Sequence, residues 1–297
     1  MKIIRVFPRK TSYTPDDDYV FIGEPPGLFV PDHDEVHISC VFTWDKPFCE
    51  YLKFQWEAHT DKPVKIGGPA YINTSWLHQT ARRAASALRL PHTKSFTPGM
   101  YVKHGIVFTS RGCNNKCPWC CVKKREGRLI ELPIVEGNII QDNNFLQCSQ
   151  EHKIRVFEML KTQKGICFKG GLQANLIDEH FLENITQLSI KELWLSCDTD
   201  NALPGFLEAT EKLRAAGYTR EHIHCYVLIG DDMDANEQRL QAVYNAGAMP
   251  FAQLYQPISD SKLEYSAEWR KFLRKWSRPA ATKAHVERGT DMKDYNT

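Results

Sequence analysis

Short apolar runs alternate with amphipathic stretches over the second half of the chain, with a period of about 30 residues, as in repeated βα units. The runs predicted to be strands are residues 105–110, 137–142, 165–170, 191–197, 222–230 and 249–255. Strands that alternate with helical segments form parallel sheets. The pattern predicts an α/β fold with six parallel strands and with functional side chains at the strand C-termini.

The segments between these strands carry residues that begin and end helices. Ser149 and Asp178 are placed to cap helices, and Asp234 with Glu237 fits a capping box. Gly247 stands where a glycine commonly ends a helix. The predicted strands are therefore separated by helical crossovers.

Alternation within the strands separates an apolar face from a polar one. Leu193, Leu195 and Cys197 share the face that is predicted to lie under helices. The opposite face collects Asp142, Lys169, Trp194, Ser196, Asp198, His224, Tyr226, Gln253 and Tyr255. Because each unpaired polar group inside a protein costs on the order of 1 to 3 kcal/mol, this concentration indicates a wet, ligand-binding interior. The alternative is that several of these residues lie in solvent at strand ends.

The front of the chain follows a different pattern. A strand at 34–42, an amphipathic helix at 46–58 and a strand at 63–68 form a βαβ-like unit, which predicts a small Rossmann-like domain. Residues 92–104, with Thr, Ser, Pro and Gly, resemble a connection.

The strand pattern stops after Pro257, and residues 269–280 predict a basic amphipathic helix followed by a polar, mobile tail. The predicted domains are residues 1–97, 98–257 and 258–297.

Composition restricts the function classes. The 297 residues carry a net charge of +2 with 25% charged residues, which is not the dense cationic surface of a protein held mainly by nucleic-acid phosphates. The N-terminus fits neither a signal peptide nor a transit peptide, and no run approaches the roughly 18 apolar residues of a membrane span. We therefore expect a cytoplasmic protein without membrane partners, where disulfides are rare and clustered thiols more often bind metal or do redox chemistry.

Four cysteines lie within residues 113–121, directly after the first of the six predicted strands. A structural zinc site closes a tetrahedron with two ligand pairs, and no second pair follows Cys117 and Cys120. Cys113, Cys117 and Cys120 can hold three corners of a 4Fe-4S cluster and leave one iron open. Cys121 is expected to be a packed thiol. The cysteines on or near later strands, Cys148, Cys167, Cys197 and Cys225, lack ligand spacing.

Cys113, Cys117 and Cys120 match the CxxxCxxC signature of the radical S-adenosylmethionine (radical SAM) superfamily, and Trp119 stands where that superfamily usually has an aromatic residue. The resemblance covers roughly residues 98–257. It implies a partial (β/α)6 TIM-like barrel with a 4Fe-4S cluster whose open iron binds S-adenosyl-L-methionine. It also implies reductive cleavage to a 5′-deoxyadenosyl radical, hydrogen abstraction from an unidentified substrate, and a reductant such as flavodoxin or ferredoxin.

The resemblance also implies cofactor contacts beyond the cysteines. Residues predicted to bind S-adenosylmethionine are Trp119, Asp142, Asn143, Asn144, Gly170, Gly171, Ser196, Asp198, Ile229 and Gly230. The alternatives are loop capping and solvation for Asp142 and Asp198, and an ordinary strand-ending turn for Gly170 and Gly171.

The front domain is similar, more weakly, to the Rossmann-like module of cobalamin-dependent members. The cobalt-ligating loop DxHxxG is absent, and Asp32, His33 and Asp34 do not reproduce it. Cobalamin-linked methyl or methylthio transfer is therefore kept as the alternative to direct hydrogen abstraction, and a non-catalytic zinc or iron-sulfur module as a second alternative. Residues 9–26 are predicted to cover the barrel mouth. Small molecules, peptides and nucleic acids all stay open as substrates.

Overall fold

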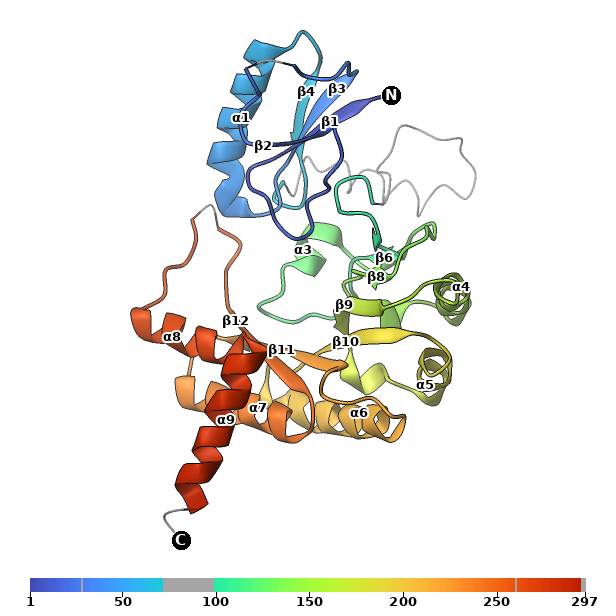
Figure 1. Ribbon diagram of the computed structural model, residues 1–297, viewed down its shortest axis with the longest axis vertical. Coiled ribbons are helices and arrows are strands. Elements are labelled where there is room, and N and C mark those ends of the chain that lie inside the picture. The colour runs from blue at the N-terminus through green and yellow to red at the C-terminus, as the bar shows by residue number, and fades with distance from the viewer. Residues whose placement is uncertain (28, 72–98, 260, 295–297) are drawn as a thin grey trace. The chain divides into compact units, whose positions relative to one another are not determined.

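The computed structural model describes residues 1–27, 29–71, 99–259 and 261–294 (Figure 1). The chain has a mixed α/β fold with parallel sheets, as the strand and helix pattern predicted. It divides into two compact units. Unit 1 comprises Met1–Ile130 and Pro257–Lys262, and unit 2 comprises Glu131–Gln256 and Leu263–Thr297. The predicted boundary at residues 97 and 98 falls on residues outside the described part, and the three-domain division stays a prediction.

Unit 1 contains a four-stranded sheet in the order β2-β1-β3-β4, in which every neighbouring pair is parallel. Its elements are β1 (Ile3–Phe7), β2 (Val20–Ile22), β3 (Glu35–Ser39), the 3-10 helix η1 (Thr43–Asp45), α1 (Lys46–His59) and β4 (Val64–Gly67). The predicted strand–helix–strand unit of β3, α1 and β4 is confirmed. β1 and β2 complete the sheet and had not been assigned from the sequence.

The core of unit 1 lies between this sheet and α1. Alternation along the strands turns Ile4 and Ile38 to the same side, where both are almost completely buried. The helix contributes Leu52 and Trp56, which are four residues apart and therefore share one helix face. Apolar burial of this kind is the main stabilising term of such a unit.

The rest of unit 1 is built from short elements. They are β5 (Ile106–Val107), β6 (Ser110–Arg111) and α3 (Val122–Glu126), and β7 (Ile130–Glu131) lies at the unit boundary. The predicted strand at 105–110 is thus realised as two short strands. The cysteine segment connects β6 to α3.

Unit 2 contains parallel strands in the order β12-β11-β10-β9-β8. The strands are β8 (Ile139–Ile140), β9 (Ile166–Leu172), β10 (Ile190–Ser196), β11 (Ile223–Ile229) and β12 (Met249–Leu254). The helices are η2 (Phe145–Gln147), α4 (Gln150–Leu160), η3 (Ala174–Leu176), α5 (Glu179–Ile185), η4 (Asp200–Ala202), α6 (Leu203–Ala215), α7 (Met233–Asn245), α8 (Ala267–Trp276) and α9 (Pro279–Asp294). Each of these strands was predicted from its apolar run.

Helices α4 to α7 lie along one side of this sheet (Figure 1). Leu193, Leu195 and Cys197 are completely buried, as predicted for the face under the helices. Phe168 of β9 packs edge-on against Phe181 of α5, with ring centroids 5.9 Å apart. The opposite face keeps the polar and aromatic side chains, because successive residues of a strand point to opposite sides.

Side chains cap several helices of unit 2. Ser149 accepts a hydrogen bond from the main-chain N–H of His152, and Asp178 accepts one from Phe181, as predicted. The predicted capping box of Asp234 and Glu237 is wrong. Asp232, with an extended backbone, caps α7 instead by accepting from the N–H of Ala235.

The chain ends in two helices that pack against one another and against β12. α8 confirms the predicted basic amphipathic helix, and the segment predicted to be a tail contains α9. Glu237 joins the two helices to α7, since it accepts from Trp276 Nε1 at 2.9 Å and contacts His285 Nε2 at 2.5 Å. Among the described residues, no helix combines the length and apolar character needed to cross a membrane.

Candidate cofactor-binding sites

The first candidate site is the thiol loop, residues 112–129 of unit 1. Its main chain is folded back on itself: the N–H of Cys113 donates to Gly127 O, and the N–H of Cys120 donates to Cys117 O, both at 3.2 Å. Cys113 and Cys120 are partly buried, and Cys117 is exposed. Cys121 and Trp119 are also partly buried. One loop therefore carries the three predicted ligands without help from another element.

The start of the thiol loop is fixed by a carboxylate and a glycine. Glu126 accepts from the main-chain N–H of Gly112 at 3.1 Å and forms an ion pair with Arg111. Gly112 has φ +79°, and a side chain there would place Cβ 2.2 Å from Arg128 O. Only glycine fits this combination of left-handed backbone and close approach.

The thiols of the loop interact electrostatically. Burial raises the pKa of Cys120, and negative charge on Cys121, Cys117 or Cys113 raises it further, whereas the N–H of Val122 lowers it. Thiolates on this loop therefore repel one another unless a cation lies between them.

The donor set fits an iron-sulfur cluster by its chemistry. Three soft thiols on one loop suit iron and sulfide, and the main-chain N–H of Asn115 donates to Cys113 Sγ at 3.5 Å. Within the part of the chain that the structure describes, no three His, Cys, Asp or Glu side chains are gathered tightly enough to hold a metal ion.

The second candidate site is the strand-end site, at the C-terminal ends of β8 to β11 in unit 2. At β8 and β9 the main chains touch, because a side chain at Gly170 would place Cβ 1.8 Å from Asp142 O. Asp142 and Asn144 are buried, with 1% and 4% of their surface exposed. Gly171 approaches Asn143, whose O would lie 4.0 Å from a Cβ there. The structure thus brings together the residues predicted at these two strands.

Gln173, directly after β9, was missed from the sequence. Its Oε1 accepts from Asn144 Nδ2 at 2.8 Å and from Gln147 Nε2 at 2.9 Å, so it ties β9 to the segment after β8. A polar residue at a strand C-terminus was the signal available for it.

Asp198, two residues after the end of β10, is a second carboxylate of the strand-end site. Its Oδ1 accepts from the N–H of Leu228 on β11 at 2.9 Å. Burial raises the pKa of Asp198, while the Leu228 hydrogen bond and the charge of Arg239 oppose that rise. Ser196, two residues earlier, is exposed. Both residues lie where a ligand at the strand ends could reach them.

The residues predicted on β11 behave differently. Ile229 lies with Val227 on the buried face, so its side chain points away from the polar face and Leu228 takes the facing position. Gly230 has φ +132°, and a Cβ there would lie 2.5 Å from the hydroxyl of Tyr265. The adenine contact predicted for this segment stays a prediction.

Aromatic and charged side chains share the polar face of the sheet. Trp194 stacks on His224 and on Tyr226, with ring centroids 4.6 and 4.4 Å away, and Lys169 Nζ lies 5.9 Å from the Trp194 ring. Glu192 accepts from Trp194 Nε1 at 2.7 Å and pairs with Lys169 at 3.1 Å. These contacts confirm that residues from β9, β10 and β11 share a face, as strand alternation predicted.

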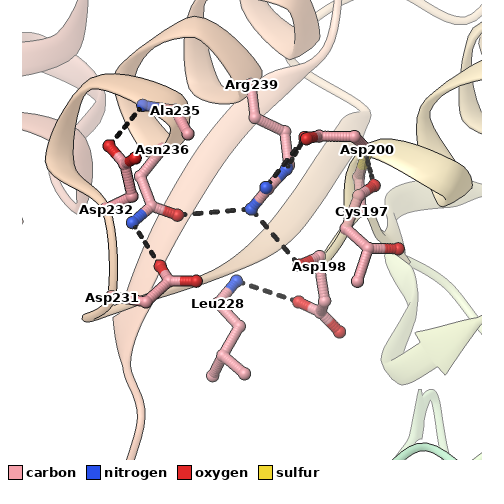
Figure 2. Close-up of polar contacts among 10 residues, drawn as sticks. Cys197, Asp198, Asp200, Leu228, Asp231, Asp232, Ala235, Asn236 and Arg239 are labelled. Atoms are coloured by element: carbon pink, nitrogen blue, oxygen red, sulfur yellow. Dashed lines mark hydrogen bonds and ion pairs between the residues drawn. The ribbon is translucent and has the colours of Figure 1, made fainter.

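Arg239 and Asn236 were also missed from the sequence. Both come from α7 and are buried beneath the loop after β10, where Arg239 contacts Asp198 and Asp200 (Figure 2). The signal was their spacing, because Asn236 and Arg239 stand four residues before Leu240 and Val243 and so continue the buried stripe of the helix.

No known protein family matches this sequence, and a search of curated proteins finds none that is similar. Any function must therefore be argued from the residues of this chain.

Proposed function

We propose that the protein is a radical S-adenosylmethionine enzyme that acts on an unidentified substrate. The observation that carries the proposal is the thiol loop: Cys113, Cys117 and Cys120 lie on one short loop that main-chain hydrogen bonds fold back on itself. A second observation supports it, since unit 2 supplies parallel strands whose C-terminal ends gather buried carboxylate and amide groups. We infer that the strands following the cysteines belong to a partial (β/α)6 barrel.

In this proposal Cys113, Cys117 and Cys120 hold a 4Fe-4S cluster. When bound, the cluster would pass an electron from a reductant such as flavodoxin or ferredoxin to S-adenosylmethionine, whose sulfonium would then break into methionine and a 5′-deoxyadenosyl radical that takes a hydrogen atom from the substrate. The chain tunes this chemistry through the N–H groups of Asn115 and Val122, which lie at the sulfurs of Cys113 and Cys120. Glu126 keeps the start of the loop in place.

The strand-end site would bind S-adenosylmethionine. The carboxylate of Asp198 is suited to accept hydrogen bonds from ribose hydroxyls, and Asp142 with Asn144 offers oxygen acceptors to an ammonium group. The close approach of Gly170 to Asp142 fixes where these acceptors lie. The exposed Ser196 is a further hydroxyl contact.

Cobalamin-linked methyl transfer is the second candidate. The strand order of unit 1, β2-β1-β3-β4, is the start of the flavodoxin-like order 2-1-3-4-5, which favours a Rossmann-like module. His33 does not resemble a cobalt ligand, because Nδ1 contacts Pro31 O at 2.9 Å and Nε2 contacts Thr60 Oγ1 at 3.1 Å. Stoichiometric cobalamin binding by the purified protein would support this candidate.

The deciding experiment is anaerobic. The protein is reconstituted with iron and sulfide, reduced with dithionite and given S-adenosylmethionine, and 5′-deoxyadenosine is measured by mass spectrometry. We expect product with the wild type and with Cys121→Ala, and none with Cys113→Ala. Zinc binding without iron or S-adenosylmethionine binding would overturn the proposal and favour a non-catalytic metal module.

A further inference from the structure

A buried arginine lies directly behind Asp198. Arg239 of α7 has 8% of its surface exposed, and its guanidinium carries a permanent positive charge. Burying such a group is unfavourable unless its donors are bonded, so its partners identify what it holds in place.

The guanidinium binds the loop after β10 at two points (Figure 2). Nε and Nη2 donate to Asp200 Oδ1 at 3.0 and 2.8 Å, and Nη1 donates to the main-chain O of Asp198 at 3.2 Å. Asp200 is largely exposed, so its ion pair alone does not explain why Arg239 is buried. The contact with Asp198 is the one that reaches the strand-end site.

The same arginine is tied to the end of β11. Nη1 also donates to Asn236 Oδ1 at 3.2 Å, and Asn236 Nδ2 donates to Asp231 Oδ1 at 2.8 Å. Asp231 lies two residues after β11, the strand whose Leu228 N–H binds Asp198. One network therefore joins the loop after β10, which contains Asp198, to the end of β11.

Asp198 keeps one acceptor for a ligand. Oδ1 is bound to Leu228, whereas Oδ2 receives no hydrogen bond from any residue that the structure describes. We propose that Arg239 is a positioning residue for S-adenosylmethionine: it holds the Asp198 carboxylate where it accepts the ribose hydroxyls. This inference rests on the proposed function, and Arg239 acts through Asp198 without touching the ligand.

The charges around Asp198 give this role a signature that a purely structural arginine lacks. The titratable groups around Asp198 are Arg239 from α7, Asp200 from the same loop, Cys197, which directly follows β10, and Cys225 on β11. Of these, Arg239 is the cation, and it lowers the pKa of Asp198 against the effect of burial. Loss of its charge should raise the pKa of Asp198. As pH falls, the variant should therefore lose its ribose contact at a higher pH than the wild type does.

The test compares Arg239→Met, Arg239→Lys and a control, Arg220→Met, in protein reconstituted with iron and sulfide. Arg220 also contacts α7, since its Nη2 donates to Tyr244 O at 2.9 Å, but it lies at the other end of the helix. The Kd of S-adenosylmethionine is measured by equilibrium dialysis over a range of pH.

We expect Arg239→Met to raise the Kd about tenfold, because a buried acceptor loses its charged donor, and to move the acid limit of binding to higher pH. Arg239→Lys should raise the Kd about threefold while leaving the acid limit near that of the wild type, because the charge is kept and the planar fork is lost. Arg220→Met should change neither.

If the wild type binds S-adenosylmethionine and Arg239→Met binds it with the same Kd and the same acid limit, the positioning role is overturned and the proposed function stands. Absence of binding by the wild type would overturn both. If Arg239→Met does not fold, as judged by amide exchange in unit 2, Arg239→Lys decides, and a Kd equal to that of the wild type contradicts the inference.

Discussion

The thiol loop of unit 1 and the strand-end site of unit 2 hold their polar groups in opposite ways. In the thiol loop, burial and the neighbouring sulfurs raise the pKa of Cys120, and no metal-binding group is assembled among the described residues. In the strand-end site, the protein itself supplies the partners: Leu228 and Arg239 hold Asp198, and Gln173 holds Asn144. The comparison teaches that the sheet preorganises the strand-end site with partners from the protein, whereas on the proposed function the thiol loop takes its partner from a bound cluster.

Removing the cluster is the strongest test of this difference. In Cys120→Ala, amide exchange within residues 112–129 should be faster than in the reconstituted wild type by on the order of 100-fold, because metal binding and loop order are coupled. The amides at the ends of β10 and β11 should not change. The measurement is peptide-resolved hydrogen exchange with mass spectrometry, and equal acceleration in both regions would contradict the comparison.

Each region contains a glycine whose main chain lies close to a carbonyl oxygen, and substitution of each glycine tests one unit independently of the other. Gly170→Ala and Gly112→Ala should each destabilise their own unit by about 2 to 3 kcal/mol, because Cβ would lie 1.8 Å from Asp142 O and 2.2 Å from Arg128 O. Exchange measured unit by unit should show the loss in unit 2 for the first variant and in unit 1 for the second.

The control for the glycine pair is Gly205→Ala in α6. Its Cβ would meet Asn175 Cβ at 3.6 Å, an ordinary contact, and alanine favours a helix. This variant should leave unit 2 as stable as the wild type or stabilise it; destabilisation would show that the clash is not the cause.

Helix capping also differs between the units and gives a smaller effect. α4, α5, α7 and α8 of unit 2 begin with side-chain caps, whereas α1 and α3 of unit 1 do not. Asp232→Ala should lower the free energy of unfolding of unit 2 by about 1 kcal/mol, because the N–H of Ala235 loses its acceptor. Asp234→Ala is the matched control and should have little effect in the same denaturant titration.

The smallest effects have opposite pH dependence in the two units. The Lys65 ammonium lowers the pKa of Glu35 in unit 1, so this carboxylate stabilises the fold above its unfolded pKa and the gain is lost as pH falls. Burial raises the pKa of Asp198 in unit 2, so its contribution is lost as pH rises through the folded pKa.

At neutral pH, Glu35→Gln should therefore destabilise unit 1 and Asp198→Asn should stabilise unit 2, each by about 0.5 kcal/mol in a partly screened environment. Both differences should vanish in acid, where the wild-type carboxyls are neutral. Unfolding titrations at neutral and acidic pH check this, and a difference of the same sign in both variants would be inconsistent with it.

The strands of unit 2 and the position of the strand-end site could be predicted from the sequence, because a buried parallel strand is an unbroken apolar run. The alternation of side chains then assigns the two faces of each strand. This worked for Leu193, Leu195 and Cys197, and for the shared face of Trp194 and Tyr226. It did not assign β1, whose short run contains Arg5, or β2, which is three residues long. Local patterns of that length do not distinguish a strand from a loop.

The network of Arg239 could not be predicted in the same way. A charged residue on an amphipathic helix ordinarily faces solvent. The spacing of Arg239 before Val243 is compatible with burial, but only tertiary contacts show which groups its guanidinium binds. The cap of α7 was missed for a related reason: Asp231, Asp232 and Asp234 all precede the apolar stripe, and the backbone conformation decides which of them caps the helix.

The burial of the ten cysteines has a practical consequence. Six are buried, namely Cys40, Cys49, Cys148, Cys167, Cys197 and Cys225, and the other four all belong to the thiol loop. A water-soluble alkylating reagent should therefore mark only that loop in the folded protein. On the proposed function, intact mass would show four adducts on protein without cofactor and a single adduct, on Cys121, on protein whose other three sulfurs bind a cluster. The number of adducts on the wild-type chain would therefore measure the fraction of thiol loops that hold a cluster, before any substrate is known.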